Sequence, residues 1–167
     1  GVEEPEQGIM KQPPRSKTNR VMDISMLIRL LAVGLTMALL ALVAYVFTLY
    51  RGGWHYGQFL AGNNPLYFQA TATVYLTLVF CQVANVFSIR TGKFRLRNLL
   101  TNRWLIFGEI ISFAMLFTIF YWPPFQNIFK VLPPRPGAWI FASTSFFVFL
   151  GLSEWLEKKL SGLKRLG

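Results

Sequence analysis

The sequence has little of what catalytic and metal-binding proteins use. Cys81 is the only cysteine and His55 the only histidine, so neither an internal disulfide nor a thiolate metal cluster can form. We expect Cys81, inside an apolar run, to be a small core residue and His55 to be a surface residue. No glycine-rich phosphate loop and no Ser/His/Asp arrangement is present. The chain therefore has no evident catalytic chemistry of its own.

Charged residues are also scarce, at 14% of the chain against about 25% in soluble domains. Hydrophobic residues make up 53%, and they gather in runs of the roughly 20 residues that a bilayer crossing needs. The sequence therefore predicts an all-α membrane protein with four transmembrane helices. We place the helices at residues 24–50, 67–89, 104–122 and 139–156, within a four-helix domain over residues 24–157.

Proline and charge mark the segments outside the apolar runs. Residues 1–23 form a polar, Pro-rich connector arm, and residues 158–167 form a basic tail. Because proline cannot continue a helix, we expect Pro123-Pro124 and Pro133-Pro134 to stop the third helix and to stiffen the connector before the fourth.

The distribution of Lys and Arg predicts the orientation of the helices. The net charge is +10, and most basic residues lie in the arm, in the connector between the second and third helices, and in the tail. The other two connectors hold only Arg51, Lys130 and Arg135. The positive-inside rule then places both termini in the cytoplasm. Basic residues in these flanking positions indicate contact with membrane lipids, and they do not suggest nucleic-acid binding.

Polar residues inside the apolar runs are the candidate functional feature. Gln82 and Asn85 lie one turn apart on the second helix, where a lipid-facing helix would carry Leu or Val, and Glu109 lies on the third. Their oxygens are ligands that Na⁺, K⁺ or Ca²⁺ accept, so these three residues are candidate cation-pathway ligands. The structural alternative is that the amides bond neighbouring helices and that Glu109 is hydrogen-bonded or protonated.

These residues need partners beyond the four helices. A dehydrated cation takes roughly six oxygens, more than this set supplies, so further ligands would come from other helices. Gly34 and Ala38 form a small-residue face that permits the close approach of another helix. We therefore expect the chain to be part of a longer polypeptide.

Several short motifs follow one another in a particular order. Ile9-Met10-Lys11-Gln12-Pro13-Pro14-Arg15 precedes the first helix, the segment from Ala70 to Asn85 lies in the second, and Tyr121-Trp122-Pro123-Pro124 ends the third. Ser153-Glu154-Trp155-Leu156-Glu157-Lys158 closes the fourth. In this order they resemble helices seven to ten of cation-transporting type II P-type ATPases, and the resemblance covers nearly the whole chain.

The resemblance implies the C-terminal membrane domain of an ATP-driven cation pump. We expect this pump in the plasma membrane, with an internal membrane as the alternative. This domain would brace the transport core and lend side-chain oxygens to the ion pathway. ATP and Mg²⁺ would serve the parent pump, whose phosphorylated Asp-Lys-Thr-Gly segment is not in this sequence, so no catalytic residue carries over. The implied partners are the remaining transmembrane helices and the cytoplasmic domains of the pump, together with membrane lipids.

The transported cation stays open. Calcium pumps of this family carry a glutamate at the position matching Gln82, whereas sodium pumps carry glutamine there and an acid at the position matching Asn85. Glu109 lies about one turn before the acidic positions of the sodium pumps. The alternative to a pump is a self-contained four-helix membrane scaffold or assembly subunit, whose polar residues would be satisfied by internal packing or self-association.

Overall fold

The computed structural model describes residues 24–91 and 103–163, and every regular element in these ranges is helical. The helices are α1 (Ile24–Arg51), α2 (Pro65–Thr91), α4 (Arg103–Tyr121), α5 (Pro123–Phe129) and α6 (Pro136–Leu163). All except the short α5 are long and apolar enough to cross a membrane. This confirms the predicted fold class of four transmembrane helices, while the cytoplasmic placement of the termini stays a prediction.

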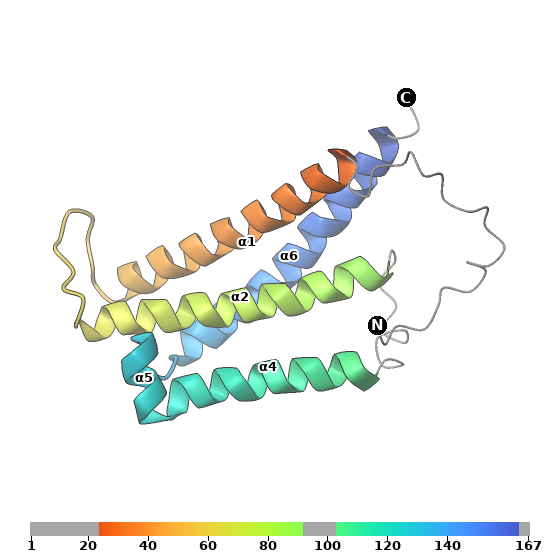
Figure 1. Cartoon of the computed structure of the whole chain (residues 1–167). Helices are drawn as coiled ribbons and strands as arrows, with labels where there is room; N and C mark the ends of the chain where they lie inside the picture. The colour runs from red at the N-terminus through yellow and green to blue at the C-terminus, as the bar shows by residue number, and fades with distance from the viewer. Residues whose placement is uncertain (1–23, 92–102, 164–167) are drawn as a thin grey trace.

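The four long helices alternate in direction (Figure 1). The start of α1, the end of α2, the start of α4 and the end of α6 lie toward one end of the molecule. The opposite end carries residues 52–64 and α5, and we call it the α5 end. α2 packs extensively against α6 and α1 but only lightly against α4, so it is the central helix of the unit.

Proline sets several helix boundaries at the α5 end. Pro65 and Pro136 are the first residues of α2 and α6, and Pro123 and Pro124 occupy the first turn of α5. The fixed φ of proline suits a first helical turn, where the missing N–H would have no helical partner. The third helix ends just before this pair, as expected. The sequence did not predict that the pair would begin a further short helix.

The core follows α2 in two clusters. The cluster toward the α5 end joins α2, α4, α6 and the connector before α6, and it consists of Ala72, Leu76, Leu116, Phe120, Val131, Ala138 and Ala142. The other joins α2 and α6 and consists of Cys81, Ala84, Phe149 and Leu150. Alanines in both clusters let the helix backbones approach closely, which is how helices associate in lipid. Cys81 is fully buried, which confirms its prediction as a core residue.

α1 and α4 leave most of their apolar side chains uncovered. Leu31 and Leu35 of α1, and Ile110 and Met115 of α4, are all at least half exposed. In water such a surface would drive association, whereas in a bilayer it faces acyl chains or other helices. Gly34 lies on this open part of α1, and a Cβ added to it would meet nothing within 4 Å. The small-residue face predicted at Gly34 therefore contacts no helix in the described ranges.

Candidate functional site

A groove between α2 and α4 brings together two of the three candidate residues. Gln82 of α2 and Glu109 of α4 both line it, with Ser112 one turn beyond Glu109. The cavity volume is about 270 Å³. Apolar and aromatic side chains complete the lining, namely Tyr75, Val79, Val86, Met115, Leu116 and Ile119.

Helical periodicity explains why these residues share the groove. Tyr75, Val79, Gln82 and Val86 follow one another at intervals of four, three and four residues, which places them along one face of α2. Residues 109, 112, 116 and 119 do the same on α4. Since α2 and α4 pack only lightly against each other, the space between these two faces stays open.

The middle of the groove is rich in oxygen acceptors. Gln82 is exposed within the described unit, and Glu109 is half-buried. The Ser112 hydroxyl donates to the Gly108 carbonyl at 3.0 Å, which leaves its lone pairs free to accept. Near the α5 end the Tyr75 ring stands edge-on to Phe129, with the ring centroids 6.3 Å apart. The arrangement can hold a hydrogen-bond donor, a water or a cation between an amide and a carboxylate.

Asn85 lies apart from these two residues. It is half-buried and does not line the groove. Three helical residues turn through about 60° less than a full circle, so Asn85 lies on the flank of the face that carries Gln82. The structure therefore brings Gln82 and Glu109 into one groove and leaves Asn85 outside it.

Sequence reasoning missed the polar groups that α2 buries most deeply. Thr73 and Thr77 are almost fully buried. The Thr73 hydroxyl donates to the Gln69 carbonyl at 2.9 Å, whereas the Thr77 hydroxyl has no hydrogen-bond partner within the described ranges. Both threonines lie four residues apart on a face of small side chains, and this spacing is the signal that would have revealed them.

A complete metal site is not present in the part of the chain that the structure describes. No three His, Cys, Asp or Glu side chains come together there. The groove offers one carboxylate with neutral oxygens, whereas a dehydrated Ca²⁺ takes six to eight oxygen ligands. Any cation bound here would draw further ligands from other helices or from water.

Four apolar helices of membrane length define a multi-pass integral membrane protein. The chain belongs to the cation-transporting ATPases, because the family described as "Cation transporting ATPase, C-terminus" matches residues 1–160. It is similar to a calcium-transporting ATPase of Bacillus subtilis (strain 168), with 28% identity over 142 residues. The match covers 84% of this chain and 15% of the relative, so the chain spans a small part of that protein's length. These findings confirm the resemblance noted from the motifs.

Proposed function

We propose that this C-terminal membrane region braces the transport core of an ATP-driven cation pump and contributes the oxygens of Gln82 and Glu109 to its ion pathway. The observation that carries the proposal is the groove between α2 and α4, which both residues line. In this proposal ATP and Mg²⁺ act in cytoplasmic domains outside this chain. The pump lies in the plasma membrane, surrounded by its lipids.

The cost of burying polar groups in hydrocarbon supports this role. An amide or a carboxylate inside a membrane is retained where it meets protein, water or an ion, because an unpartnered one is expensive. Gln82 is exposed within the four-helix unit, so its partner would come from beyond these helices. The uncovered faces of α1 and α4 offer the surface on which other pump helices can pack.

The chemistry of the groove favours a hard cation. Its polar lining consists of amide, carboxylate and hydroxyl oxygens, without thiolate or imidazole. The Bacillus relative is named for calcium transport, so Ca²⁺ is the first cation to test.

The test uses the full-length pump and compares Gln82→Leu with Leu78→Ile. Leu78 lies about one turn from Gln82 but does not line the groove, so it is a matched control. We expect Gln82→Leu to raise the Ca²⁺ concentration for half-maximal ATPase activity about tenfold, the equivalent of about 1.4 kcal/mol of lost ligand interaction. Glu109→Gln, which keeps the shape of the side chain, should shift it in the same direction.

If the Ca²⁺ dependence is unchanged in both groove variants, Gln82 and Glu109 do not contribute to cation binding. In that case α2 and α4 have a structural role only. A lower yield of folded protein with unchanged cation affinity would favour the structural alternative, in which the amide only bonds other helices. Measuring the affinity on folded, purified protein separates these two outcomes.

A further inference from the structure

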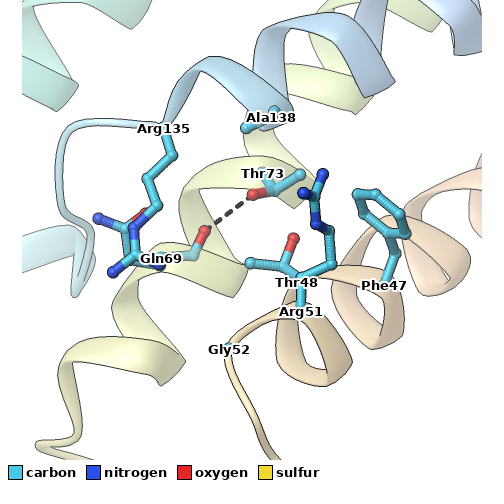
Figure 2. Close-up of a pocket in the computed structure, with 9 residues that line it drawn as sticks. Phe47, Thr48, Arg51, Gly52, Gln69, Thr73, Arg135 and Ala138 are labelled. Atoms are coloured by element: carbon cyan, nitrogen blue, oxygen red, sulfur yellow. Dashed lines mark hydrogen bonds between the residues drawn. The ribbon is translucent and has the colours of Figure 1, made fainter.

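A second pocket lies at the α5 end, where α1 ends and where α2 and α6 begin (Figure 2). Its cavity volume is about 210 Å³. Its polar lining comes from Thr48 and Arg51 of α1, Gln69 and Thr73 of α2, and Arg135 just before α6. Nothing in the proposed ion pathway uses this pocket, because the groove that contains Gln82 and Glu109 has a separate set of lining residues.

Two arginines reach this pocket from different elements. Arg51 is the last residue of α1, and its guanidinium carbon lies 5.7 Å from the centroid of the Phe47 ring. Arg135 extends from the start of α6 towards Gln69 in Figure 2. The Gln69 amide donates to the Pro133 carbonyl at 3.2 Å, which ties the segment before Arg135 to α2. The Phe47 ring therefore contacts the Arg51 guanidinium without neutralising its charge.

No carboxylate of the described residues lines this pocket. The acidic residues in the described ranges are Glu109 on α4 and Glu154 and Glu157 toward the other end of α6. Arg51 and Arg135, by contrast, both line the pocket. The charged side chains of the pocket lining are therefore all cationic, and such a lining attracts an anion.

We propose that this pocket binds a phosphate group, supplied by the headgroup of an anionic phospholipid. The planar fork of a guanidinium matches phosphate oxygens in a bidentate manner, and two such forks line the same space. Gln69 retains a second amide N–H beyond the one given to Pro133. The first turn of α6, where Gly137 and Ala138 line the pocket, adds the positive end of a helix dipole.

Size and surroundings favour a lipid as the source of the phosphate. At about 210 Å³ the cavity is smaller than the roughly 300 Å³ at which pockets begin to enclose whole small-molecule ligands, so it fits a headgroup and leaves the acyl chains outside. Phe47, one turn inward from Arg51, forms an aromatic wall of the pocket and stacks on Phe141 with the ring centroids 5.0 Å apart. A free anion would gain nothing from that wall.

The test is native mass spectrometry of the full-length protein titrated separately with phosphatidylglycerol, phosphatidylcholine and inorganic phosphate. We expect phosphatidylglycerol to bind preferentially, and Arg51→Gln and Arg135→Gln each to weaken its binding about tenfold. Lys130→Gln removes the same charge at the same end but lies outside the pocket, with its Nζ 5.8 Å from the centroid of the Phe68 ring. This control should change the affinity less than about twofold.

If Arg51→Gln, Arg135→Gln and Lys130→Gln lower the phosphatidylglycerol affinity equally, the pocket is not a specific site. The binding would then reflect only a general attraction of basic residues to an anionic surface. The protein could instead bind inorganic phosphate but not phosphatidylglycerol, with the same dependence on both arginines. That result would contradict the lipid assignment and identify a free anion as the ligand. If the glutamine variants fail to fold, Arg51→Lys and Arg135→Lys are measured instead. Lysine keeps the positive charge but cannot bind phosphate oxygens in the bidentate manner of a guanidinium. Weakened phosphatidylglycerol binding by these lysine variants supports the site, and unchanged binding overturns it.

Discussion

At the scale of single residues, one buried stripe along α2 is made of small side chains. They recur at intervals of three or four residues and are Ala70, Thr73, Thr77, Cys81, Ala84 and Ser88. This regular stripe lets α1 and α6 approach the backbone of α2. Threonine and serine can occupy such a stripe because they are small and their hydroxyls can bond to a carbonyl of their own helix.

Thr77 provides a test of this packing. Its hydroxyl is fully buried and lacks a hydrogen-bond partner within the described ranges, so Thr77→Val should leave stability unchanged or raise it by about 1 kcal/mol. Thr73→Val is the matched control, because the Thr73 hydroxyl donates to the Gln69 carbonyl. We therefore expect that Thr73→Val does not raise the stability of the protein. Thermal denaturation of the purified protein measures both, and a loss at Thr77 as large as at Thr73 would mean that the Thr77 hydroxyl has a partner.

Not every candidate residue could be placed from the sequence. The one-turn spacing of Gln82 and Asn85 predicts that the two amides share one face of the second helix. Whether each side chain faces α1, α6 or α4 depends on the rotation of α2 in the unit, and the packing of the small stripe fixes that rotation. It turns Gln82 toward α4 and leaves Asn85 outside the groove.

At the scale of the helices, the apolar runs predicted the four spans well because hydrophobic length is a strong signal. The sequence did not predict α5, because its seven residues are too few to show a periodic pattern. Local contacts stabilise this short helix. The Gln126 amide donates to the Phe120 carbonyl at 2.6 Å, and Lys130 ends the helix in the left-handed conformation with φ 55°.

The open face of α1 gives a test of the bracing role. Gly34→Leu adds a side chain where the described unit has free space, so the four helices themselves should tolerate it. In the full-length pump we expect a reduced yield of folded protein if another helix packs against Gly34, because a large residue prevents close approach. Gly151→Leu is the control, since a Cβ there also meets nothing within 4 Å.

The comparison is made by size-exclusion chromatography of both variants after identical expression. Bracing through α1 predicts aggregation or loss for Gly34→Leu and a normal profile for Gly151→Leu. A normal profile for Gly34→Leu would show that this face meets lipid and not another helix.

At the scale of the whole molecule, the distribution of basic residues predicts that the α5 end faces away from the cytoplasm. In full-length protein cleared of reactive cysteines, Cys81 included, His55→Cys should react with a membrane-impermeant maleimide in intact cells. Lys158→Cys should react only after permeabilisation. Both residues are exposed, so access depends on the side of the membrane. The reverse labelling pattern would overturn the orientation obtained from the positive-inside rule.

The apolar runs were enough to predict the class of the protein and the number of membrane spans, and the order of the motifs was enough to predict the family. These properties depend on hydrophobic length and on local signals, which need no knowledge of neighbours. The pairs of side chains that share a groove or pocket became known from the packed helices. Gln82 and Glu109 are far apart in the chain, as are Arg51 and Arg135, and each pair lines a common space because of how the helices pack. Packing between helices depends on the whole assembly, so no local pattern reveals it.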